Sequence, residues 1–570
     1  MIHEKENKNC QNCKKDFTIE ADDFGFYEKI KVPAPTWCPE CRQQRRYAWR
    51  NERTLYRRNC DLCAKSTVTI YSPNKPFKVY CHDCWWGDGW DFASYGRDFD
   101  FSVPLRPFFE QFSELQHDVP RLALLNKRSI NSEYTNHSGD NKNVYLSFSA
   151  FDDENVMYST WVFKSRDSVD CSCIYDKGER LYETIDSRTS YQCQYGLFLK
   201  DCSNCYYCYD CHGCNECFMS SNLRNKSYVF KNKQYSREEY LEKIKELDLP
   251  SFATREGLNK EFKDLFEKES IHRCVVSERN VNSIGSLIYD CKNVFKSFEV
   301  TKGEHSKYIY GGIELKDCMD IYHAGWNTTE LCYELQGCTR ASNCQFCHLC
   351  YDNMNVMYSD TCQNSQNLFG CVSVKKGEYM ILNKKYSKSE YEALKNKIIE
   401  HMKTTREYGE FFPPAIAPVY YNETQGNLYM PMTKEEVLEK SWNWEDNIPG
   451  TFGKETIQSN SIPDKIEEVP DSYLNEIFAC MDCSKNYNVT KNELMFYRKE
   501  NLPFPRRCPN CRYKRRFDLR PARKLWLRQC VCNQKHSNHS GACEVEFETC
   551  YTRESSLKIY CEKCYNQEVY

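Results

Sequence analysis

Cysteine pairs near both ends of the chain have the spacing of metal ligands. Each set of four consists of two Cys-x-x-Cys pairs, separated by 24 residues in two sets and by 17 residues in the third. A pair of this kind on a tight turn presents two thiolates to one ion, and two such turns complete a tetrahedral sulfur shell. The three sets are Cys10, Cys13, Cys38 and Cys41; Cys60, Cys63, Cys81 and Cys84; and Cys480, Cys483, Cys508 and Cys511.

A fourth set near the C-terminus departs from this pattern. We expect it to combine three clear cysteines with the second cysteine of a Cys-x-Cys: Cys530, Cys561, Cys564 and Cys532. The segment that follows carries further residues of ligand type: His536, His539, Cys543 and Cys550. A longer hairpin with spare polar residues is one interpretation of this segment. The other is that a histidine or Cys543 replaces Cys532 as the last ligand.

The chemistry of these sets favours zinc. Four thiolates suit a borderline-soft ion without a geometric preference of its own and disfavour magnesium and calcium. Protein ligands fill every coordination position, which is typical of a structural rather than a hydrolytic metal. The sequence therefore predicts four zinc ions per chain, with iron or a redox dithiol as the alternative.

Two arginine-rich segments lie between the metal pairs. Between the cysteine pairs of residues 38–63, that is between Cys41 and Cys60, lie seven arginines and one glutamate, and residues 508–532 repeat the pattern. Like charges this dense repel one another, so an anionic partner would stabilise them. A helix over 42–58 would place five of them on one face: Arg42, Arg46, Arg50, Arg53 and Arg57.

Guanidinium groups suit phosphates because they donate paired hydrogen bonds, and nearby aromatic rings can stack on unpaired bases. We therefore expect a nucleic-acid surface, with RNA or a ribonucleoprotein preferred to duplex DNA. Its candidate residues are Arg42, Arg45, Arg46, Arg50, Arg53, Arg57, Arg58, Arg512, Lys514, Arg515, Arg516, Arg520, Arg523, Lys524 and Arg528. The alternative is a protein-assembly scaffold in which these arginines form salt bridges with the protein's own acids. We find no G-x-S-x-G, HExxH or P-loop motif, so an enzyme is the least favoured class.

The chain is internally duplicated. A shift of 470 positions lays five N-terminal cysteines, and six of the arginines that follow Cys41, on C-terminal counterparts; the cysteines are Cys10, Cys13, Cys38, Cys41 and Cys60, which fall on Cys480, Cys483, Cys508, Cys511 and Cys530. In the middle, residues 141–148 match 291–298 at a shift of 150, and residues 228–240 match 379–391 at a shift of 151. The two ends are therefore copies of one module, and the centre holds two copies of another.

Within each central copy, short alternating runs recur every 11 to 14 residues, bounded by Asn, Asp, Ser or Gly. This period is too short for a helix between strands, so it favours the stacked coils of a parallel β-solenoid. An antiparallel meander of hairpins is the alternative. Each copy ends in an expected capping helix, opened by the S-x-x-E spacing of Ser236 with Glu239 and of Ser387 with Glu390.

A run of cysteines at every third residue lies in the first central copy: Cys202, Cys205, Cys208, Cys211, Cys214 and Cys217. The spacing is compatible with an iron–sulfur cluster. Only one of these thiols survives at the matching positions of the second copy, which has its own run at Cys344, Cys347 and Cys350. A ladder of small interior residues tolerates such replacement, so we favour a ladder over a metal site.

Net charge, hydropathy and cysteine content indicate in which cellular compartment the chain is expected. The 570-residue chain has a net charge of −3, no apolar run at its start typical of a signal peptide, and no stretch that could span a membrane. Many cysteines without a secretion signal indicate reduced thiols and metal in the cytoplasm. A disulfide-rich exported protein is the alternative.

The N-terminal module resembles the zinc-ribbon family with the pattern C-x-x-C-K-x-x-F, a Phe-Tyr pair and C-P-x-C-R. The matching residues are "CQNCKKDF" (10–17), "FYEK" (26–29) and "CPECR" (38–42), with a C-terminal copy in which Ser484 and Tyr487 depart mildly. The whole layout also resembles large zinc-ribbon proteins of candidate-phylum (Patescibacteria-like) bacteria, in stretches such as "NSEYTNHSGDNKN" (131–143). That resemblance implies a bacterial cytoplasmic protein and brings no activity with it.

Together these features predict a mainly β chain, a duplicated parallel β-solenoid flanked by tandem zinc ribbons. A protein partner could bind the Tyr-rich flank of the solenoid. The expected segments are tandem ribbons (1–97), a linker (98–140), a solenoid unit with its helix (141–248), a connector (249–289), a second solenoid unit with its helix (290–402), a linker (403–475) and the copied ribbons (476–570).

Overall fold

The computed structural model describes residues 4–323, 329–330, 333–334, 336–339, 350–351, 353–537 and 539–570. The chain divides into two compact units. Unit 1 comprises residues 1–124, 275–448 and 523–525, and unit 2 comprises residues 125–274, 449–522 and 526–570. Each unit thus joins one pair of ribbons to the central copy that is distant in sequence. Cys344 and Cys347 lie outside the described residues.

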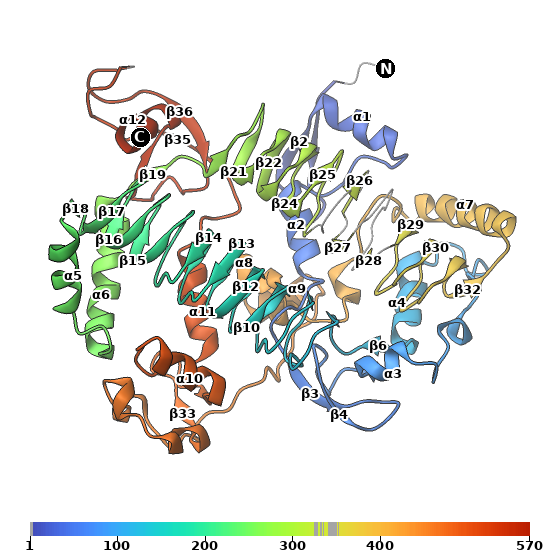
Figure 1. Cartoon of the computed structure of the whole chain (residues 1–570). Helices are drawn as coiled ribbons and strands as arrows, with labels where there is room; N and C mark the ends of the chain where they lie inside the picture. Colours follow the sequence, from blue (N-terminus) through green and yellow to red (C-terminus); the bar gives the residue numbers. More distant parts are fainter. Residues whose placement is uncertain are drawn as a thin grey trace. The chain divides into compact units, whose positions relative to one another are not determined.

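Unit 2 contains a long ladder of parallel strands. Its consecutive members are β13 (Ser172–Glu179), β14 (Ile185–Tyr191), β15 (Ser203–Tyr209), β16 (Asn215–Ser221) and β17 (Ser227–Phe230). Figure 1 draws them as successive teal to green arrows. Ser203 pairs with Asn215, and Asn215 with Ser227, so the partners lie twelve residues apart. The parallel pairing rules out an antiparallel meander for these strands.

Left-handed backbone recurs at every third residue of this ladder. The φ angles are 52° at Asp201, 50° at Asn204 and 50° at Asp210, and Gly213 follows with 64°. Asn, Asp and Gly tolerate this conformation best, which explains the Asn and Asp residues that bound each short run in the sequence. The chain therefore turns after each two extended residues.

The cysteine run occupies the interior of the ladder. All six thiols from Cys202 to Cys217 are buried in one apolar cluster, together with residues such as Val144 and Leu199. The thiol of Cys202 donates to the backbone oxygen of Cys211 at 3.1 Å, and the others make similar contacts. Among the described residues, none of the six belongs to a group that could hold a metal ion. The structure therefore favours the interpretation that these cysteines are small interior residues of the strand stack, and not ligands of a metal ion.

Unit 1 repeats this arrangement. Its parallel strands include β21 (Ile284–Tyr289), β22 (Lys292–Thr301), β23 (Glu304–Lys307), β24 (Tyr310–Ile313), β25 (Leu315–Lys316), β29 (Met354–Met357), β30 (Gln366–Phe369) and β31 (Glu378–Ile381). Val356 pairs with Leu368, and Leu368 with Met380, again at twelve residues. These side chains fill an apolar interior with neighbours such as Val294 and Ile309.

Helices follow both ladders where the sequence predicts them. Helix α5 (Arg237–Lys245) and helix α7 (Lys388–Thr404) each begin with a capping box, formed by Ser236 with Glu239 and by Ser387 with Glu390. In each box the serine accepts from the glutamate N–H while the glutamate accepts from the serine N–H, so two free backbone donors are satisfied. The predicted capping residues are confirmed.

The expected linkers contribute packed structure. Within residues 98–140, helix α4 (Phe108–Asp118) buries Phe108, Phe112 and Leu115 completely in the core of unit 1. Within residues 403–475, helices α8 (Gln425–Tyr429) and α9 (Lys434–Glu439) belong to unit 1 as well. Among the described residues, no helix is both long and apolar enough to cross a membrane.

Each ribbon begins with a short antiparallel hairpin: β1 (Glu6–Asn9) with β2 (Asp16–Ile19), β3 (Tyr56–Asn59) with β4 (Ser66–Thr69), β33 (Phe478–Ala479) with β34 (Asn486–Tyr487), and β35 (Trp526–Gln529) with β36 (Glu546–Thr549). The second cysteine pair of each ribbon opens a helix: α2 (Pro39–Tyr47), α3 (His82–Trp86), α11 (Pro509–Asp518) or α12 (Glu562–Val569). Helices α1 (Ala21–Lys29) and α10 (Lys491–Lys499) lie between hairpin and pair in two of them.

The condition under which five arginines would share one face, a single helix over 42–58, is not met. Helix α2 ends at Tyr47, and strand β3 begins at Tyr56. The second ribbon needs an extended strand just before Cys60 to form its hairpin, so the chain must leave the helix earlier. In the C-terminal copy, Pro521 lies in the corresponding interval, where it cannot continue a helix.

Candidate metal centres

The three regular cysteine sets each converge on one point. In each set the four sulfur atoms lie within 4.8 Å of one another, which agrees with the predicted ligand sets. The Sγ atoms of Cys13 and Cys38 are 3.8 Å apart, as are those of Cys483 and Cys508. A zinc–sulfur bond of about 2.3 Å gives a tetrahedral sulfur–sulfur edge of about 3.8 Å, whereas a disulfide would need about 2.05 Å. The spacing therefore fits a metal ion and excludes a disulfide.

A common backbone contact orients the sulfurs in all four ribbons. The N–H of the first cysteine in the second pair donates to the sulfur of the first cysteine in the first pair. The four contacts are Cys38 to Cys10 at 3.2 Å, Cys81 to Cys60 at 3.3 Å, Cys508 to Cys480 at 3.2 Å and Cys561 to Cys530 at 3.1 Å. Donors of this kind stabilise thiolate charge and fix the ligand direction, as outer contacts do at metal sites.

The fourth set differs from the prediction in one ligand. The thiols that lie within 4.8 Å of one another are Cys530, Cys543, Cys561 and Cys564. The Sγ atoms of Cys543 and Cys561 are 4.0 Å apart. Cys532, the predicted last ligand, lies instead in a second group with His536, His539 and Cys564.

An insertion explains this correction. Cys60 and Cys63 are three positions apart, whereas Cys530 and Cys543 are thirteen apart, so the C-terminal ribbon holds ten extra residues there. Beyond the insertion the 18-residue step from Cys63 to Cys81 recurs from Cys543 to Cys561. That recurring step is the sequence signal that identifies Cys543. The tight Cys-x-x-Cys turn is replaced by a longer loop that brings Cys543 to the same place.

In unit 1, helix α2 inserts two arginines into the second central copy. Nη2 of Arg42 lies 2.8 Å from Oδ2 of Asp320, and Nη2 of Arg46 lies 3.3 Å from Oδ1 of the same carboxylate. All three side chains are at most 1 % exposed. Burial opposes the charge of Arg42, yet Asp320 and its neighbours together outweigh burial and hold the pKa of Arg42 well above its usual value. These arginines are internal structure.

In unit 2, helix α11 likewise inserts two arginines into the first central copy. Nε of Arg512 lies 2.9 Å from Oδ2 of Asp170, and Nη1 of Arg516 lies 2.9 Å from Oδ1. Arg512 also contacts Glu493 at 3.1 Å, and Arg516 contacts Glu183 at 3.2 Å. Burial opposes the charge of Arg512, but Asp170 and its neighbours keep the pKa of Arg512 well above its usual value.

The two insertions are copies of each other. The shift of 470 relates Arg42 to Arg512 and Arg46 to Arg516, and the shift of 150 relates Asp320 to Asp170. The cation–aromatic contacts correspond as well: the guanidinium carbon is 5.5 Å from the ring centroid of Tyr308 for Arg42, and 4.7 Å from that of Tyr158 for Arg512. The duplicated ribbons and the duplicated ladders therefore kept one mode of docking.

Arg45 and its counterpart Arg515 show where the copies diverge. Arg45 is buried, where it pairs with Glu334 and places Nη1 2.8 Å from Oε2 of Glu410. Arg515 is exposed, with Nη1 3.8 Å from Oε1 of Glu256. Glu410 comes from the segment after the second ladder, which closes over Arg45 in unit 1.

The nucleic-acid prediction is wrong for the arginines that the structure buries: Arg42, Arg45, Arg46, Arg50, Arg512, Arg516 and Arg523. Arg50 pairs with Glu52 at 2.6 Å, and Arg523 with Glu299 at 2.6 Å. A phosphate cannot reach these groups without displacing their carboxylates.

The other predicted cations lie nearer the surface. Half-buried are Arg53, Arg58, Arg520 and Arg528. Arg58 contacts Asp61 at 3.1 Å, and Arg520 contacts Asp186 at 2.8 Å. Exposed are Arg57, Lys514, Arg515 and Lys524. Lys514 pairs with Asp518 and Lys524 with Glu40, both at 2.8 Å.

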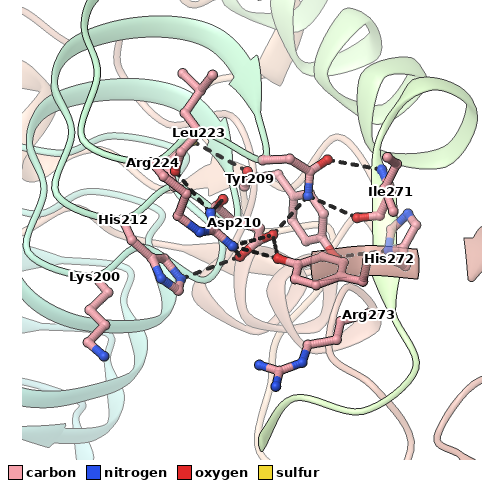
Figure 2. A network of polar contacts seen from close by, with 12 residues as sticks. Lys200, Tyr209, Asp210, His212, Leu223, Arg224, Ile271, His272 and Arg273 are labelled. Atoms are coloured by element: carbon pink, nitrogen blue, oxygen red, sulfur yellow. Dashed lines mark hydrogen bonds and ion pairs between the residues drawn. The ribbon is translucent and has the colours of Figure 1, made fainter. Parts of the chain in front are cut away.

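A polar network fixes the last ribbon to the ladder of unit 2 (Figure 2). Asp210, on the ladder, accepts hydrogen bonds from the Tyr565 hydroxyl, from Asn222 at 2.8 Å and from Arg224 at 3.1 Å. Burial raises the pKa of Asp210, but His212 and Arg224 outweigh burial and leave it lowered. Tyr565 directly follows the metal-site residue Cys564 on α12. The candidate metal site and the ladder are therefore joined through one helix.

The same ribbon is tied by backbone pairing. Strand β19 (Ile271–Arg273) pairs in parallel with β37 (Lys558–Tyr560), just before Cys561. Arg273 adds an ion pair with Glu562, whose Oε2 lies 2.7 Å from Nε. Three contacts of different kinds thus position helix α12.

A cavity of about 450 Å³ lies in unit 2 beside helices α6 (Phe252–Asp264) and α11. Its lining includes Arg507, Arg515 and Glu256. Arg507 lies 2.8 Å from Glu256, so its positive charge already faces a carboxylate. The cavity is therefore not a bare anion site.

Comparison with protein-family models, with curated proteins and with solved structures gave no match.

Proposed function

We propose that the protein is a zinc-dependent, non-enzymatic assembly scaffold in which the ribbons fasten each end of the chain to a β-solenoid. One observation carries the proposal. In both units, the helix that begins at the second cysteine pair of a ribbon also buries two arginines on one aspartate of the central copy. Metal binding and docking thus use the same short helix.

Zinc is supported by the donor set. The tetrads offer only thiolates, with sulfur separations near the tetrahedral edge, and none of their cysteines forms a disulfide. Closed sites of this kind contribute folding free energy rather than catalysis. Free thiols in this number also fit the reducing cytoplasm.

The proposal of a solenoid is supported by parallel pairing of strands at an offset of twelve residues in many pairs and of 11, 13 or 14 residues in others. Such a stack offers repetitive outer ladders to a partner. One is an exposed row of amides in which Asn131 donates to Asn143, Asn143 to Asn155, and Asn155 to Asp167. This exposed, hydrogen-bonded row is a surface that a partner protein could contact.

Binding of RNA through the arginine-rich segments is the alternative function, and it can be tested directly. The zinc-loaded protein is titrated with labelled single-stranded RNA at low and high salt. We expect no specific binding, because the buried arginines of these segments already pair with carboxylates. Of the four exposed cations among the predicted residues, Lys514, Arg515 and Lys524 also face carboxylates. The purified protein should also show the absorbance ratio of protein without nucleic acid.

A matched variant sharpens this experiment. Arg57→Ala, Lys514→Ala, Arg515→Ala and Lys524→Ala combined should change RNA affinity less than about 2-fold. Affinity that falls with salt at a slope of about 0.7 per phosphate contact, and that disappears in this variant, would restore the nucleic-acid function.

A further inference from the structure

The ten-residue insertion in the last ribbon carries three residues of ligand type. Cys532, His536 and His539 all lie between Cys530 and Cys543, in the stretch that the N-terminal copy lacks. Cys532 is buried, and the side chain of His536 is only 5 % exposed. An insertion made only to lengthen a loop has no need to direct such residues inward.

Cys532, His536 and His539 lie in one group with Cys564, a cysteine of the neighbouring tetrad. Nε2 of His536 lies 3.1 Å from Sγ of Cys532, and Nε2 of His539 lies 3.1 Å from Sγ of Cys564. The four donor atoms lie within 4.8 Å of one another. Bonds of about 2.3 Å to sulfur and 2.0 Å to nitrogen give a tetrahedral edge of about 3.5 Å, so the group is close to the size of a zinc site.

Contacts behind the donors hold them in place. Nδ1 of His539 lies 2.8 Å from the backbone oxygen of Gly541, so that nitrogen carries the proton and Nε2 keeps a free lone pair. The backbone N–H of His536 donates to the backbone oxygen of His539 at 3.0 Å. The N–H of Ser537 donates to Gln567 on helix α12 at 2.9 Å. The loop is therefore fixed against the helix that bears Cys564.

We propose that Cys532, His536, His539 and Cys564 bind a second zinc ion in the last ribbon, with the Cys564 thiolate bridging the two ions. The inference deepens the proposed role of the ribbons and rests on it. Charge favours a bridge. One zinc ion with four thiolates carries two negative charges, whereas two ions with five thiolates and two neutral histidines carry one. A shared sulfur thus lowers the negative charge buried in the cluster.

Metal counting by native mass spectrometry tests the proposal. The full chain equilibrated with zinc should hold five ions, and the His536→Ala/His539→Ala variant should hold four. Asn533→Ala, an exposed change in the same insertion, should keep five. Four ions in both the wild type and the histidine variant would overturn this inference and leave the four tetrads intact. Failure of the tetrads themselves would show as fewer than four ions in every protein.

Cobalt substitution tests the bridge separately. Two cobalt ions that share a thiolate couple magnetically, so the fully loaded chain should show a weakened electron paramagnetic resonance signal per ion. The signal per ion should recover in His536→Ala/His539→Ala, because only one ion then remains in this ribbon. Glu568, whose Oε1 is 3.4 Å from Nε2 of His536, is the competing ligand. Glu568→Gln should keep five ions and the coupling; loss of one ion there would assign the fourth position to Glu568 and contradict the bridge.

Discussion

Stripping zinc with a strong chelator is expected to unfold the ribbons of both units and release helices α2 and α11 from the ladders. Structural zinc contributes about 10–16 kcal/mol to small zinc domains, comparable to or above the total stability of a typical domain, about 5–15 kcal/mol. A single ligand change should already be severe. Cys508→Ser is expected to cost one zinc ion and more than about 4 kcal/mol of unfolding free energy, the range in which loss of a metal site lies.

An interior cysteine provides the matched control. The thiol of Cys208 donates to the backbone oxygens of Tyr206 and Cys217, contacts that a serine hydroxyl can also make. Cys208→Ser should therefore keep every zinc ion and lose much less stability than Cys508→Ser. Zinc count and the urea midpoint at fixed free zinc measure both effects. A Cys508→Ser protein with a full zinc count and the midpoint of the wild type would contradict a structural metal at that site.

The second large effect is expected at the aspartates that receive the arginines. Asp170→Asn removes the charge that faces Arg512 and Arg516, and breaking a buried ion pair costs about 3–5 kcal/mol. Both arginines keep one other carboxylate, so we expect a loss near 3 kcal/mol. Asp320→Asn should act in the same way on unit 1. Denaturant unfolding at constant zinc measures each loss.

An exposed ion pair on the ladder is the control for this experiment. Arg128 and Asp140 are 2.7 Å apart, with side chains that are 72 % and 47 % exposed. Asp140→Asn should cost at most about 1 kcal/mol, because solvent screens such pairs. Equal losses for Asp140→Asn and Asp170→Asn would mean that the buried carboxylate does not hold helix α11.

Local patterns were enough to predict much of the architecture. The twelve-residue rhythm, the two duplications and the capping serines at Ser236 and Ser387 are short-range signals, and each has its counterpart in the structure. The regular cysteine pairs also converge as their spacing predicts. These features depend on residues that are neighbours in sequence or are repeated at a fixed shift.

The role of the arginines could not be predicted in this way. Arg42 meets Asp320 across 278 residues, and Arg516 meets Asp170 across 346 residues. Counted within their own segment, the arginines have almost no acidic neighbours, so an external anion was the simpler partner to expect. Docking of each ribbon on the distant central copy supplies Asp320 and Asp170, whereas Arg50 pairs with Glu52 of its own segment.

The fourth metal set departs from its prediction for a different reason. The shift of 470 that holds up to Cys530 becomes 480 from Cys543 onward. If the shift of 470 is applied across the insertion, the nearest cysteine to Cys530 is Cys532. Reading the ribbon backward from Cys561 selects Cys543, since the spacing on that side is unchanged.

Hydrogen exchange with and without zinc tests the central claim most directly, namely that bound metal seats the arginine helices on the ladders. With zinc, the backbone amides of α2 and α11 should exchange slowly, together with those of the strands around Asp320 and Asp170. After chelation, protection should be lost in both helices and weakened in those strands, while the cysteine-lined interior near Cys208 stays protected. Unchanged protection of α2 and α11 in the zinc-free chain would contradict the account.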